Sequence, residues 1–347
     1  MLSYIIPFLI LILVVVFIHE YGHYYFARKY GVGVTDFSIG FGKELFGWND
    51  KHGTRWKVCA IPLGGYVKFF GDRNVYSQAD HEEILEKYNE EERDKLFILK
   101  PLYQRVLIVF GGPLANFLLA LAIFFCIYTF VGKDFTPAVI SEVQKDSPAM
   151  AGGLKDSDII LEIDGNKVKS IMDVSKYIMM STDDFIDFKV KRSYDELLLK
   201  IKPKIVMGED NLGNKINKRM VGIKLGAYNN EINHVKLGPA QAIYHAAHEV
   251  YYVSISSLKY IGAMIFGKAD TSQLGGPIRI AKISGQVAEF GILAFISMMA
   301  YISISLGLVN LFPIPMLDGG HLMFYAFEKF LGRPLSQKTQ EGFFRIG

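Results

Sequence analysis

The chain begins with eighteen residues, Met1 to Ile18, that carry no charged side chain. Because about 20 apolar residues in a helix cross the hydrocarbon core of a bilayer, this run predicts a membrane span over roughly Tyr4 to Ala27. It has no positive n-region and no small-x-small cleavage site, so we interpret it as a retained span and not as a signal peptide. Two more spans are predicted where the chain is again uncharged, at Val106 to Val131 and at Phe290 to about Leu311.

The first span ends in the pentapeptide His19-Glu20-Tyr21-Gly22-His23. Two histidines four residues apart project from one face of a helix and can hold one zinc ion. Glu20 lies beside them, where it could take a proton from a water molecule on that ion. Ionisable side chains are costly at membrane depth, so their presence favours a functional site over a wet helix end with two unrelated histidines.

A third zinc ligand is expected from the segment after the third span, because catalytic zinc usually has three protein ligands. There Pro313 and Pro315 break the helix, which allows the carboxylate of Asp318 to be aimed inward. We assign Asp318 as the third ligand. His321 is the alternative because histidine is the commoner metal ligand, but its neighbouring glycines favour a turn.

The composition is that of a membrane protein with a soluble insert. Half of the 347 residues are hydrophobic and the mean hydropathy is +0.22, which is apolar for a soluble protein and mild for a chain wholly in lipid. The net charge of +3 is too small to indicate a nucleic-acid partner. The two cysteines, Cys59 and Cys126, are far apart, which argues against a disulfide framework or a cysteine zinc site.

The predicted fold is an α-helical polytopic membrane protein with membrane-associated β-hairpins and an inserted α/β domain. Basic residues flank the segment that joins the first two spans, so this segment is expected to face the cytoplasm and the insert to lie outside. We divide the chain into 1–132 (two spans with β-loops between them), 133–230 (the insert), 231–288 (an amphipathic interfacial segment and a loop) and 289–347 (the third span, the Asp318 segment and a cytoplasmic tail).

Three stretches outside the spans have distinct patterns. Thr35 to Gly71 alternates apolar residues with glycines, which predicts β-hairpins that dip into the membrane. Asp80 to Lys95 is dense in charge and predicts an exposed helix. Leu237 to Phe266 is apolar but carries four ionisable residues, which predicts an amphipathic helix on the membrane surface. Its His245, His248 and Glu249 could bind a regulatory metal, but histidines on such a helix are more often simply interfacial.

The second span begins with Gly111-Gly112-Pro113 and carries Asn116 soon afterwards. Small residues let helices approach closely, and a polar side chain in lipid needs a partner. For Asn116 we favour structural packing, with contact to substrate or to a loop as the second interpretation.

The insert, about Thr136 to Gly226, is predicted to be a compact α/β module. Strands are expected at 138–143, 159–163, 187–192, 197–201 and 221–225, and a helix at 171–180. Asp164-Gly165 indicates a tight turn. The run Ser147-Pro148-Ala149, followed by Gly152-Gly153-Leu154, resembles a PDZ domain of the bacterial protease type, a fold that binds peptides by adding a strand to a sheet edge. The alternative is a small domain that acts only as a steric plug.

Taken together, these motifs resemble the site-2 protease family of intramembrane zinc metalloproteases, and most closely its bacterial RseP-type branch. The resemblance rests on His19-Glu20-x-x-His23, on the run Asn310 to Gly320 with its Leu317-Asp318-Gly319 core, and on a single PDZ-like insert before the third span. It covers nearly the whole chain. It implies that His19, His23 and Asp318 bind Zn²⁺ and that Glu20 is the catalytic base.

The resemblance also implies how substrate is held. Asn310 matches a polar residue that holds substrate or polarises the scissile carbonyl. Gly64, Gly65, Tyr66 and Val67 match a β-loop that takes substrate as an added strand. The implied activity is cleavage of transmembrane segments of single-span membrane proteins, such as anti-sigma factors or signal-peptide remnants. The implied location is the bacterial inner membrane, with the active site near the cytoplasm, the PDZ domain in the periplasm, and membrane lipid but no nucleic acid as a partner.

Two departures from that branch stand out. It often has two PDZ domains, and this chain has room for one. It normally has a fourth span after the aspartate motif, and the sequence ends at Gly347, so we expect a truncated chain. Two other functions remain open: a membrane-bound PDZ scaffold with a structural or inactive zinc site, and a metal transporter. Glu20 argues against the first, and the PDZ-like insert argues against the second.

Overall fold

In the computed structural model, the described residues are 2–71, 88–209, 215–227, 233–267 and 276–333. They form two compact units. The first consists of Met1–Ile123 with Ser284–Gly347, and the second of Phe124–Ile283. The three predicted spans begin in the first unit, and the predicted zinc ligands belong to it. The insert belongs to the second unit.

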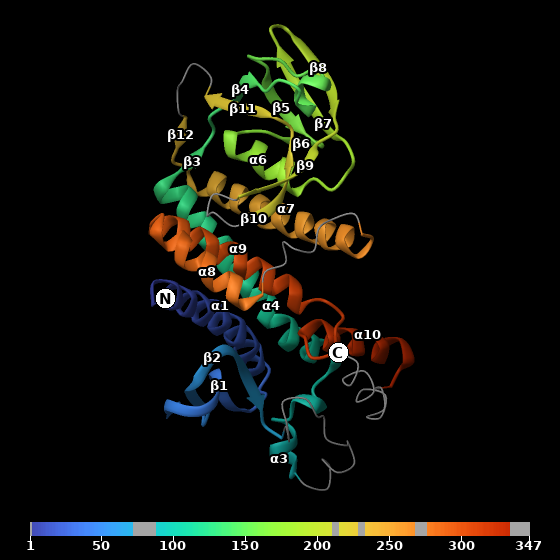
Figure 1. The fold of residues 1–347 in the computed structure, drawn as a ribbon. Coiled ribbons are helices and arrows are strands. Elements are labelled where there is room, and N and C mark those ends of the chain that lie inside the picture. The colour runs from blue at the N-terminus through green and yellow to red at the C-terminus, as the bar shows by residue number, and fades with distance from the viewer. Residues whose placement is uncertain (1, 72–87, 210–214, 228–232, 268–275, 334–347) are drawn as a thin grey trace. The chain divides into compact units, whose positions relative to one another are not determined.

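The first unit is built on three long apolar helices, α1 (Leu2–Lys29), α4 (Leu102–Cys126) and α9 (Ile292–Asn310). Each is long and apolar enough to cross a membrane, α4 together with a short continuation to Val131. Their ends lie within four residues of the spans predicted from the sequence. A fourth helix, α10 (Asp318–Leu331), follows α9 after a break (Figure 1).

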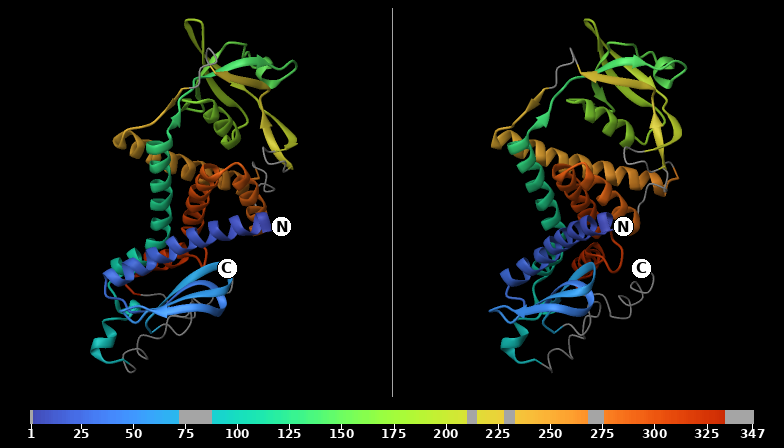
Figure 2. Two further views of the ribbon diagram at one scale, coloured as in Figure 1. Left: turned by 90° about the vertical axis from the view of Figure 1, so that its left-hand side faces the viewer. Right: turned by 60° about the vertical axis from the view of Figure 1, so that its left-hand side comes forward.

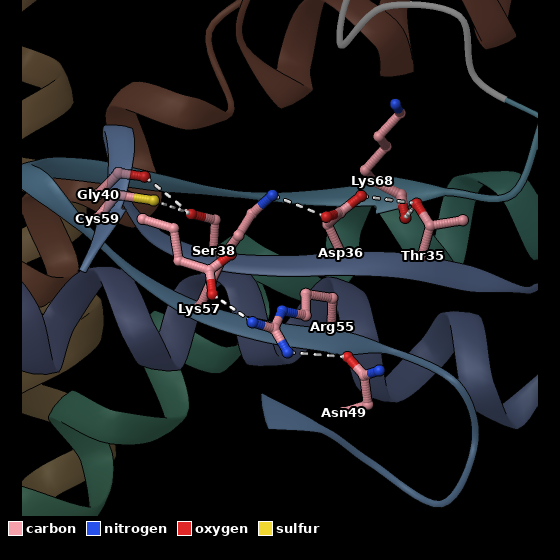
Figure 3. A network of polar contacts seen from close by, with 10 residues as sticks. Thr35, Asp36, Ser38, Gly40, Asn49, Arg55, Lys57, Cys59 and Lys68 are labelled. Carbon is pink, nitrogen blue, oxygen red and sulfur yellow. Dashed lines mark hydrogen bonds and ion pairs between the residues drawn. The ribbon is translucent and has the colours of Figure 1, made fainter. Parts of the chain in front are cut away.

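One antiparallel pair of strands lies between α1 and α4, where β-hairpins were predicted. Strands β1 (Val34–Asn49) and β2 (Arg55–Phe69) pair antiparallel, and both bend, so that Ser38 lies opposite Tyr66 and also opposite Lys57. Successive side chains of a strand point to opposite faces. One face therefore carries a polar network in which Lys57 Nζ lies 2.7 Å from a carboxylate oxygen of Asp36 (Figure 3).

The other face of the hairpin is aromatic and packs against α1. The rings of Phe37 and Trp56 stack with their centroids 4.1 Å apart. Phe17 and Tyr24 of α1 meet Phe37 edge-on, at 5.6 and 5.8 Å. The hairpin is thus amphipathic across its faces, and its apolar face is fixed to the helix that carries the two histidines.

The second unit contains a six-stranded sheet in which the order is β11-β4-β5-β7-β8, with β6 paired to β5. Figure 2 shows this sheet from two further sides. The strands are β4 (Ala138–Val143), β5 (Ile159–Ile163), β6 (Asn166–Lys167), β7 (Ile186–Arg192), β8 (Asp195–Ile201) and β11 (Ile223–Ala227). Helix α6 (Ile171–Met180) packs on the sheet around fully buried residues such as Ile163 and Phe188. The turn between β5 and β6 uses positive φ at Asp164 (47°) and Gly165 (77°), as a tight turn requires.

Several elements of the second unit differ from the expectation. The last strand was expected at 221–225 but begins at Ile223, because Gly222 has a φ of +82° and leaves the extended conformation. The hairpin β9 (Lys204–Glu209) and β10 (Lys215–Met220) was not predicted. Helix α5 (Pro148–Ala151) and the short pair β3 (Lys133–Asp134) and β12 (His234–Val235) were not predicted either.

The predicted amphipathic helix is α7 (Pro239–Ile265), and it belongs to the same compact unit as the insert. Its buried Glu249 forms an ion pair with Lys176 of α6, whose Nζ lies 3.2 Å from the carboxylate. Helix α8 (Pro277–Glu289) follows. Part of the charged stretch predicted to be helical lies outside the described residues, and the part that is described contains only the short helix α3 (Glu90–Arg93).

Candidate metal centre

Three potential ligand atoms from distant parts of the chain meet in the first unit. The Nε2 atoms of His19 and His23 lie 3.3 Å apart. Asp318 brings one carboxylate oxygen to 3.2 Å from His19 Nε2 and the other to 3.5 Å from His23 Nε2. Within the described part of the chain, this is the one group of three or more His, Cys, Asp or Glu side chains arranged to hold a metal.

The cluster fits a zinc ion. Tetrahedral zinc with bonds of about 2.0–2.1 Å separates its ligand atoms by roughly 3.3 Å, which is close to the three separations observed. The side chains of His19, His23 and Asp318 are 9, 11 and 17 % exposed, and Asp318 Oδ2 accepts no hydrogen bond. A zinc ion held by two imidazoles and one carboxylate would keep a fourth position open to water or substrate.

Asp318 reaches the histidines through a tight break between α9 and α10. Two prolines follow α9, and Met316 takes a left-handed backbone conformation with a φ of +83°. A Cβ atom at Gly319 would overlap the backbone of the preceding loop, and one at Gly320 would lie 2.5 Å from the carbonyl oxygen of Ile314. Glycine is therefore needed at both positions for α10 to start against the loop with Asp318 as its first residue.

A buried ion pair holds α10 to the start of α4. Arg105 is 8 % exposed and donates through both terminal nitrogens to the carboxylate of Glu328, with Nη1 3.0 Å from Oε2. Its Nε donates to the backbone carbonyl of Lys100, and its guanidinium lies 5.1 Å from the centre of the Tyr325 ring. This clamp fixes the helix that begins with Asp318.

Helix α4 supports both histidines from the opposite side. His23 Nδ1 lies 2.9 Å from the backbone carbonyl oxygen of Ile108, which can only accept a hydrogen. His19 Nδ1 lies 3.2 Å from the side-chain amide of Asn116, which is fully buried. A Cβ atom at Gly112 would lie 2.8 Å from a ring carbon of His19, so α4 can approach this closely only with glycine there.

Asn116 is a residue of the site that the sequence analysis did not identify as such. Packing was favoured for it, whereas the structure places its amide against His19. The available signal was a polar side chain in an apolar span, which needs a partner. The sequence does not say which helix supplies that partner.

The predicted base and the predicted substrate strand lie next to each other. Glu20 is 9 % exposed and packs beneath β2, where a Cβ atom at Gly65 would lie 2.9 Å from its Cγ. Gly64 has a φ of +133° and packs against the ring of Phe41. The segment formed by Gly64, Gly65, Tyr66 and Val67 is therefore the part of the hairpin that lies beside Glu20.

Two predicted residues lie outside the cluster of donor atoms. Asn310 is the last residue of α9 and is half-buried. His321 lies in the first turn of α10 with its ring edge-on to Phe324, at 6.4 Å. Of the two rivals for the third position, Asp318 and not His321 faces the histidine pair.

Two histidines and a carboxylate around one point, beside a buried glutamate and on helices fit to span a membrane, define a membrane metalloprotease. The sequence agrees with this class. Residues 7–347 match the model of Peptidase family M50, and the chain belongs to that family. It is a zinc metalloprotease.

Relatives match over nearly the whole chain. A protein of Agrobacterium fabrum, named provisionally as a zinc metalloprotease, is 42 % identical over 99 % of this chain and 91 % of its own length. A protein of Rhizobium meliloti with the same kind of name is 41 % identical, over 100 % and 92 %. Metalloprotease MmpA of Caulobacter vibrioides is 34 % identical, over 99 % and 90 %. Among solved structures, the PDZ domain of an SdrC-like protein of Listeria monocytogenes is 28 % identical, covers 26 % of this chain and 88 % of that one, and has a TM-score of 0.21.

Proposed function

We propose that this protein is an intramembrane protease that cleaves transmembrane segments of single-span membrane proteins, such as anti-sigma factors or signal-peptide remnants, in regulated intramembrane proteolysis. The position of the donor cluster carries the proposal. His19 and His23 belong to a helix long and apolar enough to span a membrane, and Asp318 follows another such helix after a short loop. A peptide bond that reaches these side chains lies at membrane depth.

In this proposal, His19, His23 and Asp318 hold zinc and Glu20 is the catalytic base. Zinc supplies a bound water of lowered pKa and polarises the scissile carbonyl. Glu20 takes the proton of the attacking water and passes it to the leaving amine nitrogen. The burial of Glu20 beside His19 supports this role, because bulk water cannot easily compete for the proton there.

The segment Gly64–Val67 is proposed to bind substrate as an added strand. A helical substrate has its carbonyls in hydrogen bonds and must unwind before cleavage, and pairing with a strand replaces the bonds it loses. This segment pairs with β1 on one side, where Tyr66 lies opposite Ser38. Its other side has no strand partner among the described residues. Asn310 is proposed as a further substrate contact at the end of α9.

The insert is proposed to be a single PDZ domain that selects substrates by their C-termini. Its strand β11 lies at the edge of the sheet, with a neighbour only on the β4 side among the described strands. Helix α6 packs beside β11 and exposes Met172 and Met179. An extended peptide added to β11 would run alongside this helix.

We also propose that α7 lies on the periplasmic surface of the bacterial inner membrane. The backbone N–H of Leu237 donates to the carbonyl of Tyr128, which ties the start of α7 to the end of the second span. Its buried side faces the insert through Glu249. Most of the large side chains on its exposed side are apolar or aromatic, with Tyr251 66 % and Leu258 41 % exposed. Such a helix is suited to the boundary between water and lipid.

Cleavage of a model single-span substrate in detergent tests the proposed function. We expect wild type to cleave, and Glu20→Gln and Asp318→Ala to lose activity. Zinc should remain bound in Glu20→Gln and be weakened in Asp318→Ala. His321→Ala is the matched control and should keep both zinc and activity. Cleavage by Glu20→Gln would refute the role of Glu20 as the catalytic base. Loss of zinc in His321→Ala with undiminished zinc in Asp318→Ala would refute Asp318 as the third ligand.

A further inference from the structure

We infer that Asn116 is a positioning residue that selects the zinc-binding tautomer of His19 by turning its side-chain amide. The inference rests on the proposed function, because it requires His19 to bind zinc through Nε2. It concerns the second nitrogen of the ring, Nδ1, which lies 3.2 Å from the amide of Asn116.

The two histidines reach the required tautomer in different ways. A neutral imidazole carries one hydrogen, so a ring that binds metal through Nε2 must carry that hydrogen on Nδ1 and donate it to an acceptor. For His23 the acceptor is the backbone carbonyl oxygen of Ile108, 2.9 Å from Nδ1. Because this oxygen can only accept, it favours the tautomer that carries the hydrogen on Nδ1. For His19 the partner is an amide, which can either donate or accept.

The side-chain amide of Asn116 lies against Nδ1 of His19 and can serve either tautomer of the ring. Its nitrogen faces His19 Nδ1, and its oxygen is buried without a hydrogen bond. A donor at this position places the hydrogen of His19 on Nε2, which can donate it to Nε2 of His23 at 3.3 Å. A half-turn of the amide presents the oxygen to Nδ1 instead, and this is the arrangement that zinc binding at Nε2 requires. Asparagine can therefore pair with both tautomers of His19 through one contact.

The surroundings of Asn116 fix its backbone, whereas its side-chain amide can present either its nitrogen or its oxygen to His19. The residue is fully buried, and its backbone carbonyl accepts a hydrogen bond of 2.9 Å from the hydroxyl of Ser303 on α9. Asn116 thus joins α4 to α9 through its backbone and to α1 through its side chain. Rotation of the amide changes only the second of these links.

Three variants separate this role from packing, with zinc affinity as the readout. Asn116→Leu keeps the size of the side chain but offers no acceptor, and we expect zinc to bind about 10–100-fold more weakly, as is typical when the outer partner of a metal-binding histidine is removed. Asn116→Asp keeps the acceptor, and its affinity should return close to that of wild type. Ser303→Ala removes the backbone link alone and should leave zinc affinity unchanged. Competition with a chelator measures each value.

The absorption spectrum of the cobalt-substituted protein gives a second readout. We expect Asn116→Leu to change the ligand-field bands and Asn116→Asp to restore them. If Asn116→Leu does not fold, Asn116→Ala takes its place. Wild-type zinc affinity and spectrum in Asn116→Leu would overturn the inference, and so would an Asn116→Asp variant no better than Asn116→Leu. His19→Ala distinguishes the two failures: if it binds zinc like wild type, the proposed metal site is wrong and not only the role of Asn116.

Discussion

Gly22 of α1 and Gly111 of α4 meet backbone to backbone. A Cβ atom at Gly111 would lie 2.6 Å from the carbonyl oxygen of Gly22, and a Cβ atom at Gly22 would overlap the carbonyl of Gly111. The contact lies one residue away from His23 on α1 and from Gly112 on α4. The crossing therefore sets how closely α4 approaches the proposed zinc ligands.

We expect Gly22→Ala and Gly111→Ala to push the two helices apart. Overpacking in a close-packed interior typically costs about 1–3 kcal/mol, and here the clash is with backbone, which cannot move aside like a side chain. Both variants should lower the thermal unfolding temperature in detergent and weaken zinc binding. The control is Gly262→Ala in α7, where a Cβ atom meets nothing within 4 Å. Equal stability in all three variants would show that the crossing tolerates a wider separation.

The ion pair between Arg105 and Glu328 yields a second prediction. Removing one partner of a buried pair strands the other charge, which typically costs about 3–5 kcal/mol. We therefore expect Glu328→Gln to lower thermal stability markedly and to weaken zinc binding, because α10 begins with Asp318. The exposed pair of Lys224 with Glu142, 59 and 54 % exposed, provides the control. Glu142→Gln should cost about 0–1 kcal/mol, and a similar loss in both variants would contradict the proposed clamp.

A third prediction concerns pH and the turn between β1 and β2. Asp50 in this turn accepts hydrogen bonds from Tyr24 of α1, from the indole of Trp56 and from the backbone amides of His52 and Thr54. Burial raises the pKa of Asp50, but the hydrogen bonds outweigh burial and lower the pKa to about 2. A carboxyl with a lowered folded pKa stabilises the fold fully above its unfolded value of about 3.9, and this contribution is lost as pH falls through the folded value.

The hairpin should therefore loosen from α1 as pH falls from about 4 towards 2. Tryptophan fluorescence measures this directly, since both tryptophans of the chain, Trp48 and Trp56, lie in the hairpin. Asp50→Asn should be less stable already at neutral pH and should show a weaker acid response in this window. Glu44→Gln, which removes an exposed carboxylate bonded to Arg55, should keep the wild-type response. If the fluorescence of Asp50→Asn changes with pH as in wild type, the acid response does not come from Asp50.

Local patterns predicted most of the elements. The helix and all five strands expected in the insert lie within two residues of their observed ends, because alternation, turn residues and caps act over a few positions. The unpredicted elements are of another kind. The hairpin of β9 and β10 carries charge and little alternation, and α5 is only one turn long. Such segments depend on contacts with the rest of the sheet.

The candidate metal centre also has one part that local sequence patterns predict and another part that they do not. The spacing of His19 and His23 alone determines that their rings share one face of α1, since one helical turn relates them. The apolar runs likewise determine which helices can enter a membrane. These features depend on neighbours in the chain, and the helix geometry that relates such neighbours is always the same.

Only the tertiary structure decided which distant side chains meet this pair. Asp318 rather than His321 faces it because the glycines after Asp318 let α10 start tightly against the loop. Asn116 faces His19 because α1 and α4 cross at Gly22 and Gly111 with no side chain between them. The register of two helices joined by a long connection depends on shape complementarity over their whole contact, and no local pattern in the sequence specifies it.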